Sequence, residues 1–178
     1  MRRVVIYLAP LSVLLLVAAS PRKGPSIPTK AVRVQRGAYL ATIPGCHDCH
    51  SPKSAPATMA PDMERPLSGR PSTTAVPAKP AAMGEISASG DLTAWYGPWG
   101  VSYAANLTPD TETGLGKRYT EASFIRTMRT GKKPEGEVLL PPMPWPNYAR
   151  MTDEDLKSLW AYLQTIKPVN NFVRQAAR

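Results

Sequence analysis

The chain has 178 residues, with 20 prolines and 12 glycines against only two phenylalanines, and a formal net charge of +9. This length suits one domain with additions, and the composition indicates a loop-rich protein with a thin apolar core, a kind that usually needs a disulfide, a metal or a cofactor. The basic residues are dispersed without a long block, which argues against a nucleic-acid-binding protein and favours solubility together with attraction to an acidic protein partner.

Residues 1–19 have the pattern of an export signal. Arg2 and Arg3 precede an apolar stretch over 4–17, and small residues end it. As a helix, 4–19 would rise only about 24 Å, which is short of the roughly 30 Å hydrocarbon core of a bilayer. We therefore expect either a cleaved signal peptide or, alternatively, a retained N-terminal membrane anchor. Both predict a periplasmic protein, soluble or anchored, and argue further against nucleic acid as a partner.

Beyond this segment we expect one domain. A linker over 20–30 leads into a domain over 31–170, and 171–178 form a C-terminal tail. Within the domain, residues 51–105 are rich in Pro, Ala, Ser and Gly and follow no sustained helical or strand period. They predict a long irregular loop insertion.

Three helices are predicted on the two sides of this insertion. Residues 31–42 repeat apolar positions at helical spacing until a Pro-Gly pair stops the pattern. After the insertion, 120–129 follow a helical pattern with Thr120 as N-cap and Gly131 as stop. The last helix begins at Thr152, because three acidic residues follow it and suit the first turn of a helix. The expected fold class is therefore all-α, with one long insertion.

The string Cys46-His47-Asp48-Cys49-His50 contains the only two cysteines and the only two histidines of the chain. A disulfide would close too small a loop to stabilise much, structural zinc would need four ligands, and a thioredoxin-like redox pair would need a strand–helix pattern around it. Covalent haem attachment fits better, because two thiols at this spacing can add to the two haem vinyl groups while His50 binds the iron as proximal ligand. His47 is not expected to be a ligand.

Met143 is the candidate for the second iron ligand. It lies between Pro142 and Pro144 in a proline-stiffened loop over 139–146, just before the last helix. A thioether held in a rigid loop loses little conformational entropy when it binds a metal. A lone methionine is more often core filler, and we assign that role to Met59, Met63, Met83, Met128 and Met151.

Taken together, these features resemble a class I c-type cytochrome. The order of an N-terminal helix, a CxxCH string, a middle helix, a methionine loop and a C-terminal helix is similar to that of monohaem bacterial cytochrome c domains, which occur alone or as cytochrome subunits of membrane dehydrogenases. The stretches that carry the resemblance are "GAYLATIPGCHDCHSPK", "NLTPDTETGLG", "FIRTMRTGK", "LPPMPWPNY" and "MTDEDLKSLWAYLQTI". It covers roughly residues 33–169 and is least specific in the proline-rich part of the insertion.

The resemblance implies a small helical domain around one haem c, bound covalently through Cys46 and Cys49. His50 and Met143 would be the iron ligands. The insertion is far longer than in a minimal member of the family, and the single CxxCH string implies a single haem. The candidate donors for the haem carboxylates are Trp99, Tyr103, Trp145, Tyr148 and Arg70.

The resemblance also implies how the first and last helices pack. Gly37 and Tyr39 of the first helix would meet Trp160 and Tyr162 of the last one, with a small residue against an aromatic one. Such a contact would explain a glycine inside a helix, where it costs about 1 kcal/mol relative to alanine.

The implied function is single-electron transfer in the periplasm, as a shuttle or as the cytochrome subunit of a larger redox complex. The chain would be an electron carrier and not an enzyme, because two protein ligands leave the iron no open position for a substrate. Its expected partners are a redox donor and acceptor with an acidic docking surface, and a membrane complex is one setting for them. One alternative is a haem enzyme, or a gas- or peroxide-binding haem protein, in which Met143 leaves the iron. Another is a non-haem interaction protein with an exported CxxC disulfide.

Overall fold

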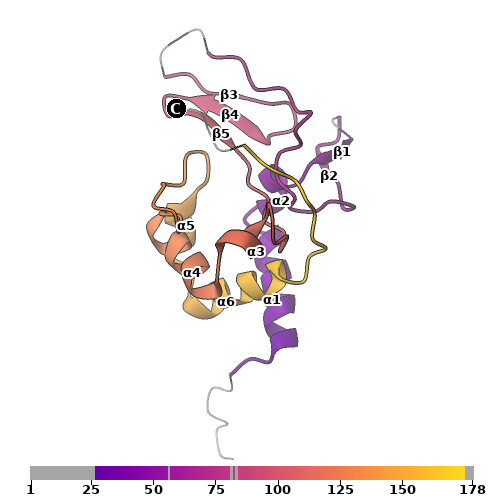
Figure 1. The fold of residues 1–178 in the computed structure, drawn as a ribbon, viewed down its shortest axis with the longest axis vertical. Coiled ribbons are helices and arrows are strands. Elements are labelled where there is room, and N and C mark those ends of the chain that lie inside the picture. Colours follow the sequence, from indigo (N-terminus) through magenta and orange to yellow (C-terminus); the bar gives the residue numbers. More distant parts are fainter. Residues whose placement is uncertain (1–26, 56, 81, 83, 175–178) are drawn as a thin grey trace, which may run out of the picture.

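The computed structural model describes residues 27–55, 57–80, 82 and 84–174. Within them the chain forms six helices and five short strands, with the strands at one end of the molecule and the longer helices at the other (Figure 1). The helices are α1 (Lys30–Thr42), α2 (Cys46–His50), α3 (Leu115–Arg118), α4 (Glu121–Thr130), α5 (Trp145–Tyr148) and α6 (Asp153–Leu163). The strands are β1 (Lys53–Ala55), β2 (Ala60–Pro61), β3 (Ser87–Ala88), β4 (Ala94–Gly97) and β5 (Gly100–Tyr103).

The predicted signal peptide or anchor, 1–19, lies outside the described residues. Among the residues that are described, none of the helices combines the length and the apolar character needed to cross a bilayer. The fate of the N-terminal segment therefore stays a prediction.

Helices α1 and α6 cross each other at Gly37. This glycine is buried, and a Cβ there would clash with the backbone carbonyl of Ser158 and lie 2.6 Å from the Cβ of Tyr162. The close approach therefore requires a residue without a side chain. The predicted contact between Gly37 and Tyr162 is confirmed, whereas the side chain of Tyr39 is largely turned to solvent, with 54% of the residue exposed.

Helix α4 packs on α6 through Phe124 and Trp160. Their ring centroids lie 5.4 Å apart with the rings tilted by 40°, so Trp160, expected at the α1 crossing, contacts α4. Thr120 caps α4 in a capping box, and Gly131 ends it in the left-handed conformation with φ of 68°. The helix predicted over 120–129 is confirmed, because both end signals act as the sequence indicated.

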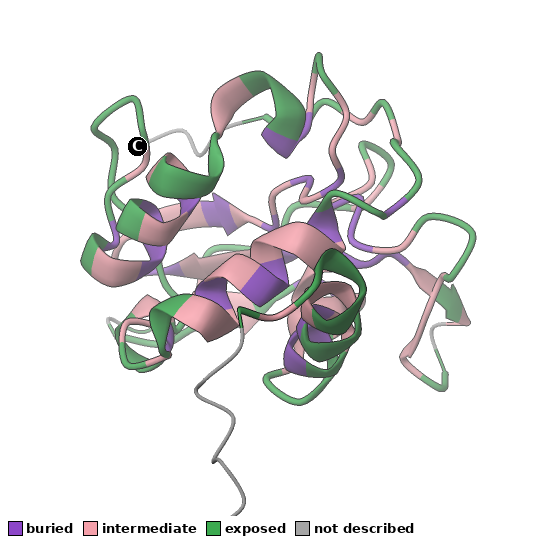
Figure 2. Ribbon diagram, turned by 90° about the horizontal axis from the view of Figure 1, so that it is seen from below, coloured by how far each residue is buried: buried purple, intermediate pink, exposed green. Residues whose placement is uncertain are grey.

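The apolar core lies where the helices meet. Figure 2 views the helical end and shows that each of the longer helices carries both buried and exposed positions. The core cluster consists of Ala41, Leu67, Leu115, Phe124, Met128, Tyr148, Leu156, Leu159, Leu163 and Ile166. Leu67 comes from the insertion and is fully buried, so the insertion contributes to the core as well as to the surface.

The prediction of an all-α fold is wrong, and the error lies in the insertion over 51–105. There β1 and β2 form an antiparallel pair, and β3, β4 and β5 form a three-stranded antiparallel sheet in chain order. A tight turn joins β4 to β5, and Gly97 pairs with Gly100 at its base. Strands of two to four residues are too short to display an alternating period, so the sequence pattern concealed them.

Asp91 organises the connection between β3 and β4. Its carboxylate accepts hydrogen bonds from the hydroxyls of Ser89 at 2.6 Å and Thr74 at 2.7 Å. The backbone N–H and the hydroxyl of Thr93 also donate to it, at 3.1 and 2.9 Å. Burial raises the pKa of Asp91, but these hydrogen bonds outweigh it and leave the pKa lowered.

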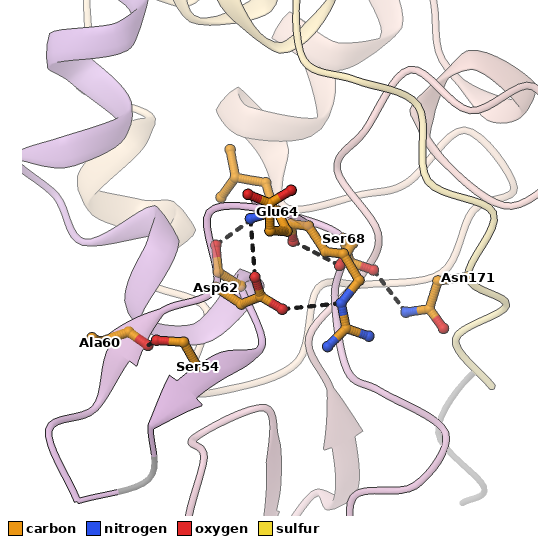
Figure 3. Close-up of polar contacts among 9 residues, drawn as sticks. Ser54, Ala60, Asp62, Glu64, Ser68 and Asn171 are labelled. Atoms are coloured by element: carbon orange, nitrogen blue, oxygen red, sulfur yellow. Dashed lines mark hydrogen bonds and ion pairs between the residues drawn. The ribbon is translucent and has the colours of Figure 1, made fainter.

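Side-chain hydrogen bonds also fix the first part of the insertion (Figure 3). Asp62 accepts from Arg65 Nε at 3.0 Å and so closes a tight turn. Asn171, from the C-terminal segment, donates to the backbone carbonyls of Ser68 at 2.7 Å and Arg70 at 3.0 Å. The C-terminal segment therefore ties the insertion to the helical part of the molecule.

Candidate functional site

A cavity of about 400 Å³ lies between the helices and the insertion. This volume is in the range of small-molecule and cofactor sites, and most of the wall is apolar. The four residues predicted to hold the haem all line it: Cys46 and Cys49, predicted to attach it, and His50 and Met143, predicted as iron ligands. Two segments separated by more than ninety positions in the chain, the cysteine string and the methionine loop, thus face one space.

The cysteine string folds as α2, a single helical turn. Gly45 precedes it with φ of 74°, and a Cβ there would lie 2.5 Å from a carboxylate oxygen of Asp48, so the entry to the turn requires glycine. Cys46 and Cys49 are three positions apart on this turn and therefore share a face, and both are free thiols. Burial raises the pKa of Cys46 to about 11 and raises that of Cys49 as well. Both thiols are therefore neutral near pH 7.

The ring of His50 is half-buried and is oriented by a distant backbone group. Its Nδ1 lies 2.8 Å from the carbonyl oxygen of Ala105, 55 positions further along the chain. Because a carbonyl can only accept, Nδ1 carries the proton and Nε2 keeps its lone pair. Burial lowers the pKa of His50 more than the hydrogen bond to Ala105 raises it, so the ring is neutral, the form that binds a metal. Because Ala105 is so far along the chain, the sequence does not show which group accepts from His50.

Lys53 is a residue of the site that sequence reasoning missed. Its ammonium donates to the backbone carbonyls of Asp48 at 2.6 Å and Ser51 at 3.0 Å, at the C-terminal end of α2. A positive charge at this end of a helix is stabilising. His47 lies outside the cavity lining, with Nδ1 3.0 Å from the Ser51 hydroxyl.

The methionine loop follows α4 and places Met143 in the cavity wall. At its start, the N–H of Leu139 donates to the Gly131 carbonyl at 2.7 Å. At its end, the ring of Trp145 covers Gly131 so closely that a Cβ there would lie 2.5 Å from it. The N–H of Met143 donates to the Leu140 carbonyl at 3.2 Å. The loop is thus closed on itself and anchored at both ends to the end of α4.

Of the donors suggested for haem carboxylates, Tyr103 and Tyr148 belong to the cavity lining. The lining does not include Trp99, Trp145 or Arg70. The guanidinium of Arg70 lies 4.8 Å from the centroid of the Tyr103 ring. Tyr148 donates to the Pro44 carbonyl at 3.3 Å and so helps to fix the entry to α2.

The wall also contains cationic side chains that the sequence did not single out. They are Arg118, Lys133 and Arg174. The Nε of Arg118 is buried, and no group among the described residues accepts a hydrogen bond from it. Buried donors are normally satisfied, and a guanidinium is well suited to a carboxylate. An apolar cavity with two thiols, a neutral imidazole, a thioether and this donor fits a haem, which carries two vinyl groups and two carboxylates.

The insertion forms part of the wall, which the prediction of an irregular loop did not anticipate. Its lining residues are Trp95, Ser102, Tyr103, Ala104 and Ala105. Two of these five residues, Trp95 and Tyr103, are aromatic. Elsewhere in the described part of the chain, no group of three or more His, Cys, Asp or Glu side chains could hold a metal ion.

Several known proteins similar to this chain are named as cytochromes or cytochrome subunits. It is 34% identical over 175 residues to the fructose dehydrogenase cytochrome subunit of Gluconobacter japonicus, a match that covers 92% of this chain and 30% of the relative. It is 35% identical over 138 residues to the cytochrome c subunit of the quinone alcohol dehydrogenase of Gluconacetobacter polyoxogenes. This match covers 76% of this chain and 22% of the relative. A diheme c-type cytochrome of Cereibacter sphaeroides is 33% identical over 95 residues, a match that covers 51% of this chain and 31% of the relative.

The chain thus spans less than a third of the length of the first two relatives. No family model matches it. The names of the relatives support a place for the chain among cytochromes c and imply haem c as the cofactor. Since one relative is named as a diheme protein, the number of haems is a separate question.

Proposed function

We propose that this chain is a class I cytochrome c with one covalent haem, and that it transfers single electrons as the cytochrome subunit of a larger redox complex. The observation that carries the proposal is the shared cavity: both thiols, the neutral imidazole and the thioether line one apolar space. The relatives support the same function, because they are named as cytochrome subunits of dehydrogenases and not as the catalytic subunits. The chain is accordingly proposed to be an electron carrier and not an enzyme.

Each of the four residues has one role in this proposal. Cys46 and Cys49 would bond to the haem vinyl groups, His50 would be the proximal ligand and Met143 the distal one. The buried Nε of Arg118, which has no acceptor among the described residues, would donate a hydrogen bond to a haem carboxylate. When bound, the haem supplies one-electron exchange between ferrous and ferric iron.

The chain's own residues would tune that exchange. The hydrogen bond from His50 to the Ala105 carbonyl holds the imidazole in one orientation and raises its basicity as a ligand. A thioether such as Met143 favours ferrous iron and so raises the reduction potential relative to a second histidine. The apolar wall excludes water, and with both ligands held in place no position is left for a substrate.

The location and partners are also part of the proposal. If 1–19 is an export signal or an anchor, the chain works in the periplasm, either free or attached to a membrane. The formal charge of +9 would attract a redox partner with an acidic docking surface. The redox donor, the acceptor and any membrane complex remain to be identified by their binding to the holoprotein.

Replacement of one cysteine tests covalent attachment. In Cys49→Ala one of the two thiols is gone, so most of the covalently bound haem should be lost from a denaturing gel stained for haem. His47→Ala is the matched control, because His47 belongs to the same turn but not to the cavity lining, and it should keep the haem. Full, heat-stable staining of Cys49→Ala would overturn the proposal.

Replacement of the methionine tests the sixth ligand. Met143→Ala should retain the haem but bind added cyanide or carbon monoxide readily, since a coordination position is open. Met63→Ala is the control, because Met63 is exposed and outside the cavity lining. An unchanged, ligand-resistant, low-spin spectrum for Met143→Ala would mean that another residue is the ligand. Ready binding by the wild type would instead favour the gas- or peroxide-binding alternative.

A further inference from the structure

The insertion contacts the methionine loop directly. Ser102, on β5, donates a hydrogen bond of 2.5 Å from its hydroxyl to the carbonyl of Pro141, 39 positions further along the chain. Ser102 is buried, with 9% of the residue exposed. In Figure 1 the loop between α4 and α5 rises from the helical end toward the three-stranded sheet, which is where this bond forms. The bond reaches the loop two residues before Met143.

Ser102 is itself held in place from two sides. Across the sheet it pairs with Trp95 of β4. Within the hairpin, the indole Nε1 of Trp99 donates to the Ser102 hydroxyl at 3.3 Å. A hydroxyl has one proton and two lone pairs, so it can accept from Trp99 while it donates to Pro141. The ring of Trp99 lies against Gly97, where a Cβ would be only 2.5 Å away, so the indole is fixed on the hairpin.

The other hydrogen bonds at the middle of the methionine loop are local: the N–H of Met143 donates to the Leu140 carbonyl at 3.2 Å, and the N–H of Trp145 donates to the Met143 carbonyl at 2.9 Å. Four of the residues over 139–146 are prolines, which have no N–H to donate. Pro141, Pro142 and Pro144 are exposed, and the anchors described above act at Leu139 and Trp145, at the two ends. A loop with exposed residues and few backbone hydrogen bonds is expected to open locally at low free energy. A contact at its middle therefore has a large influence on where Met143 lies.

We propose that the β4–β5 hairpin is a clamp for the methionine loop, and that Ser102 is a positioning residue for Met143. This inference rests on the proposed function, in which Met143 is the distal ligand. The bond to Pro141 would favour conformations with the thioether in the cavity over conformations with the loop displaced. The insertion would thus control how readily small external ligands replace Met143 on the iron.

The test is Ser102→Ala in the haem-loaded protein, titrated with imidazole in the ferric state. Loss of one buried hydrogen bond should make imidazole bind roughly three- to tenfold more tightly, because the loop opens more easily. The weak charge-transfer band from sulfur to ferric iron should also fade at lower temperature than in the wild type. Trp99→Phe, which removes the indole donor but leaves the cavity wall unchanged, should shift both readouts in the same direction and less far.

Ser87→Ala is the matched control. Ser87 lies in the same sheet and donates at 2.5 Å to the Ala78 carbonyl, within the insertion and away from the methionine loop. It should leave both readouts at wild-type values. If the wild type shows the charge-transfer band but Ser102→Ala binds imidazole no more tightly than Ser87→Ala, the clamp is overturned. If the wild type itself lacks the band, the failure lies in the assignment of Met143 and not in the clamp.

Discussion

The helical part and the insertion reach their order by different means. Helices α1, α4 and α6 bury an apolar core and approach so closely at Gly37 that no side chain fits. The insertion has short strands and is held by side-chain hydrogen bonds such as those to Asp91. The helical part is therefore sensitive to volume, whereas the insertion is sensitive to the loss of individual polar groups.

The two regions meet at the cavity, and each supplies different groups to it. The helical part supplies the apolar wall and carries both cysteines on α2. The insertion supplies the acceptor for His50, at Ala105, and the hydroxyl that reaches the methionine loop, at Ser102. The segment that looks least regular in the sequence therefore orients both proposed iron ligands.

The largest effect is expected from crowding the helix crossing. Gly37→Ala improves helix propensity by about 1 kcal/mol, but its Cβ clashes with α6, so we expect a net loss of about 3 kcal/mol in the free energy of unfolding. Urea unfolding of the holoprotein measures it. Gly90→Ala is the control, because a Cβ there meets no atom within 4 Å. Equal stability of the two variants would mean that the crossing is not tightly packed.

A smaller loss is expected where the end of the insertion joins the C-terminal segment. Asn106 is 1% exposed, donates to the Val169 carbonyl at 2.8 Å and accepts from the Thr108 hydroxyl at 2.7 Å. Asn106→Ala leaves these buried groups unsatisfied and should lower the free energy of unfolding by about 2 kcal/mol. The exposed Asn147→Ala serves as control. A loss no greater than that of the control would contradict a structural role for this amide.

The insertion should also respond to acid through Asp91. The folded-state pKa of Asp91 is lowered, so its contribution is fully present above the unfolded value of 3.8 and is lost as the pH falls through the folded value. Asp91→Asn should lower the free energy of unfolding by about 1 kcal/mol at pH 7. Below pH 4 the free energies of unfolding of the variant and the wild type should become more similar. Urea unfolding across this range gives the difference. A difference in the free energy of unfolding that does not change with pH would show that the charge of Asp91 does not stabilise the fold.

The smallest effect is expected from an exposed ion pair on the helical part. Arg36 contacts Asp155 at 2.9 Å across the α1–α6 interface. Exposed ion pairs contribute little to stability because water screens them, so Arg36→Ala should lower the free energy of unfolding less than any of the variants above, and less still in high salt. A loss as large as that of Gly37→Ala would mean that charge pairing, and not apolar packing, holds this region.

The sequence predicted well what local signals specify. Thr120 and Gly131 bound α4, and Thr152 caps α6, because capping depends on residues only three or four positions apart. The residues that complete the site depend on distant contacts. The partner of His50 lies 55 positions away at Ala105. No local pattern marks such a carbonyl.

The strands of the insertion escaped prediction for a related reason. Each is too short to show a period, and their pairing is fixed by the turn near Gly97 and by contacts with the rest of the molecule. The segment has aromatic residues at Trp95 and Trp99, a composition that is compatible with packing on the domain. This composition could not indicate that Ser102 reaches the methionine loop.

The measurement that tests the central claim most directly is an absorption spectrum of the protein produced with a c-type maturation system. It is recorded oxidised and then reduced, before and after acid–acetone extraction. We predict sharp reduced bands that stay with the polypeptide through extraction, and a weak charge-transfer band from sulfur to iron in the oxidised state. A polypeptide that retains no haem would contradict the account. Cys46 and Cys49 would then be interpreted as two free thiols or as a disulfide.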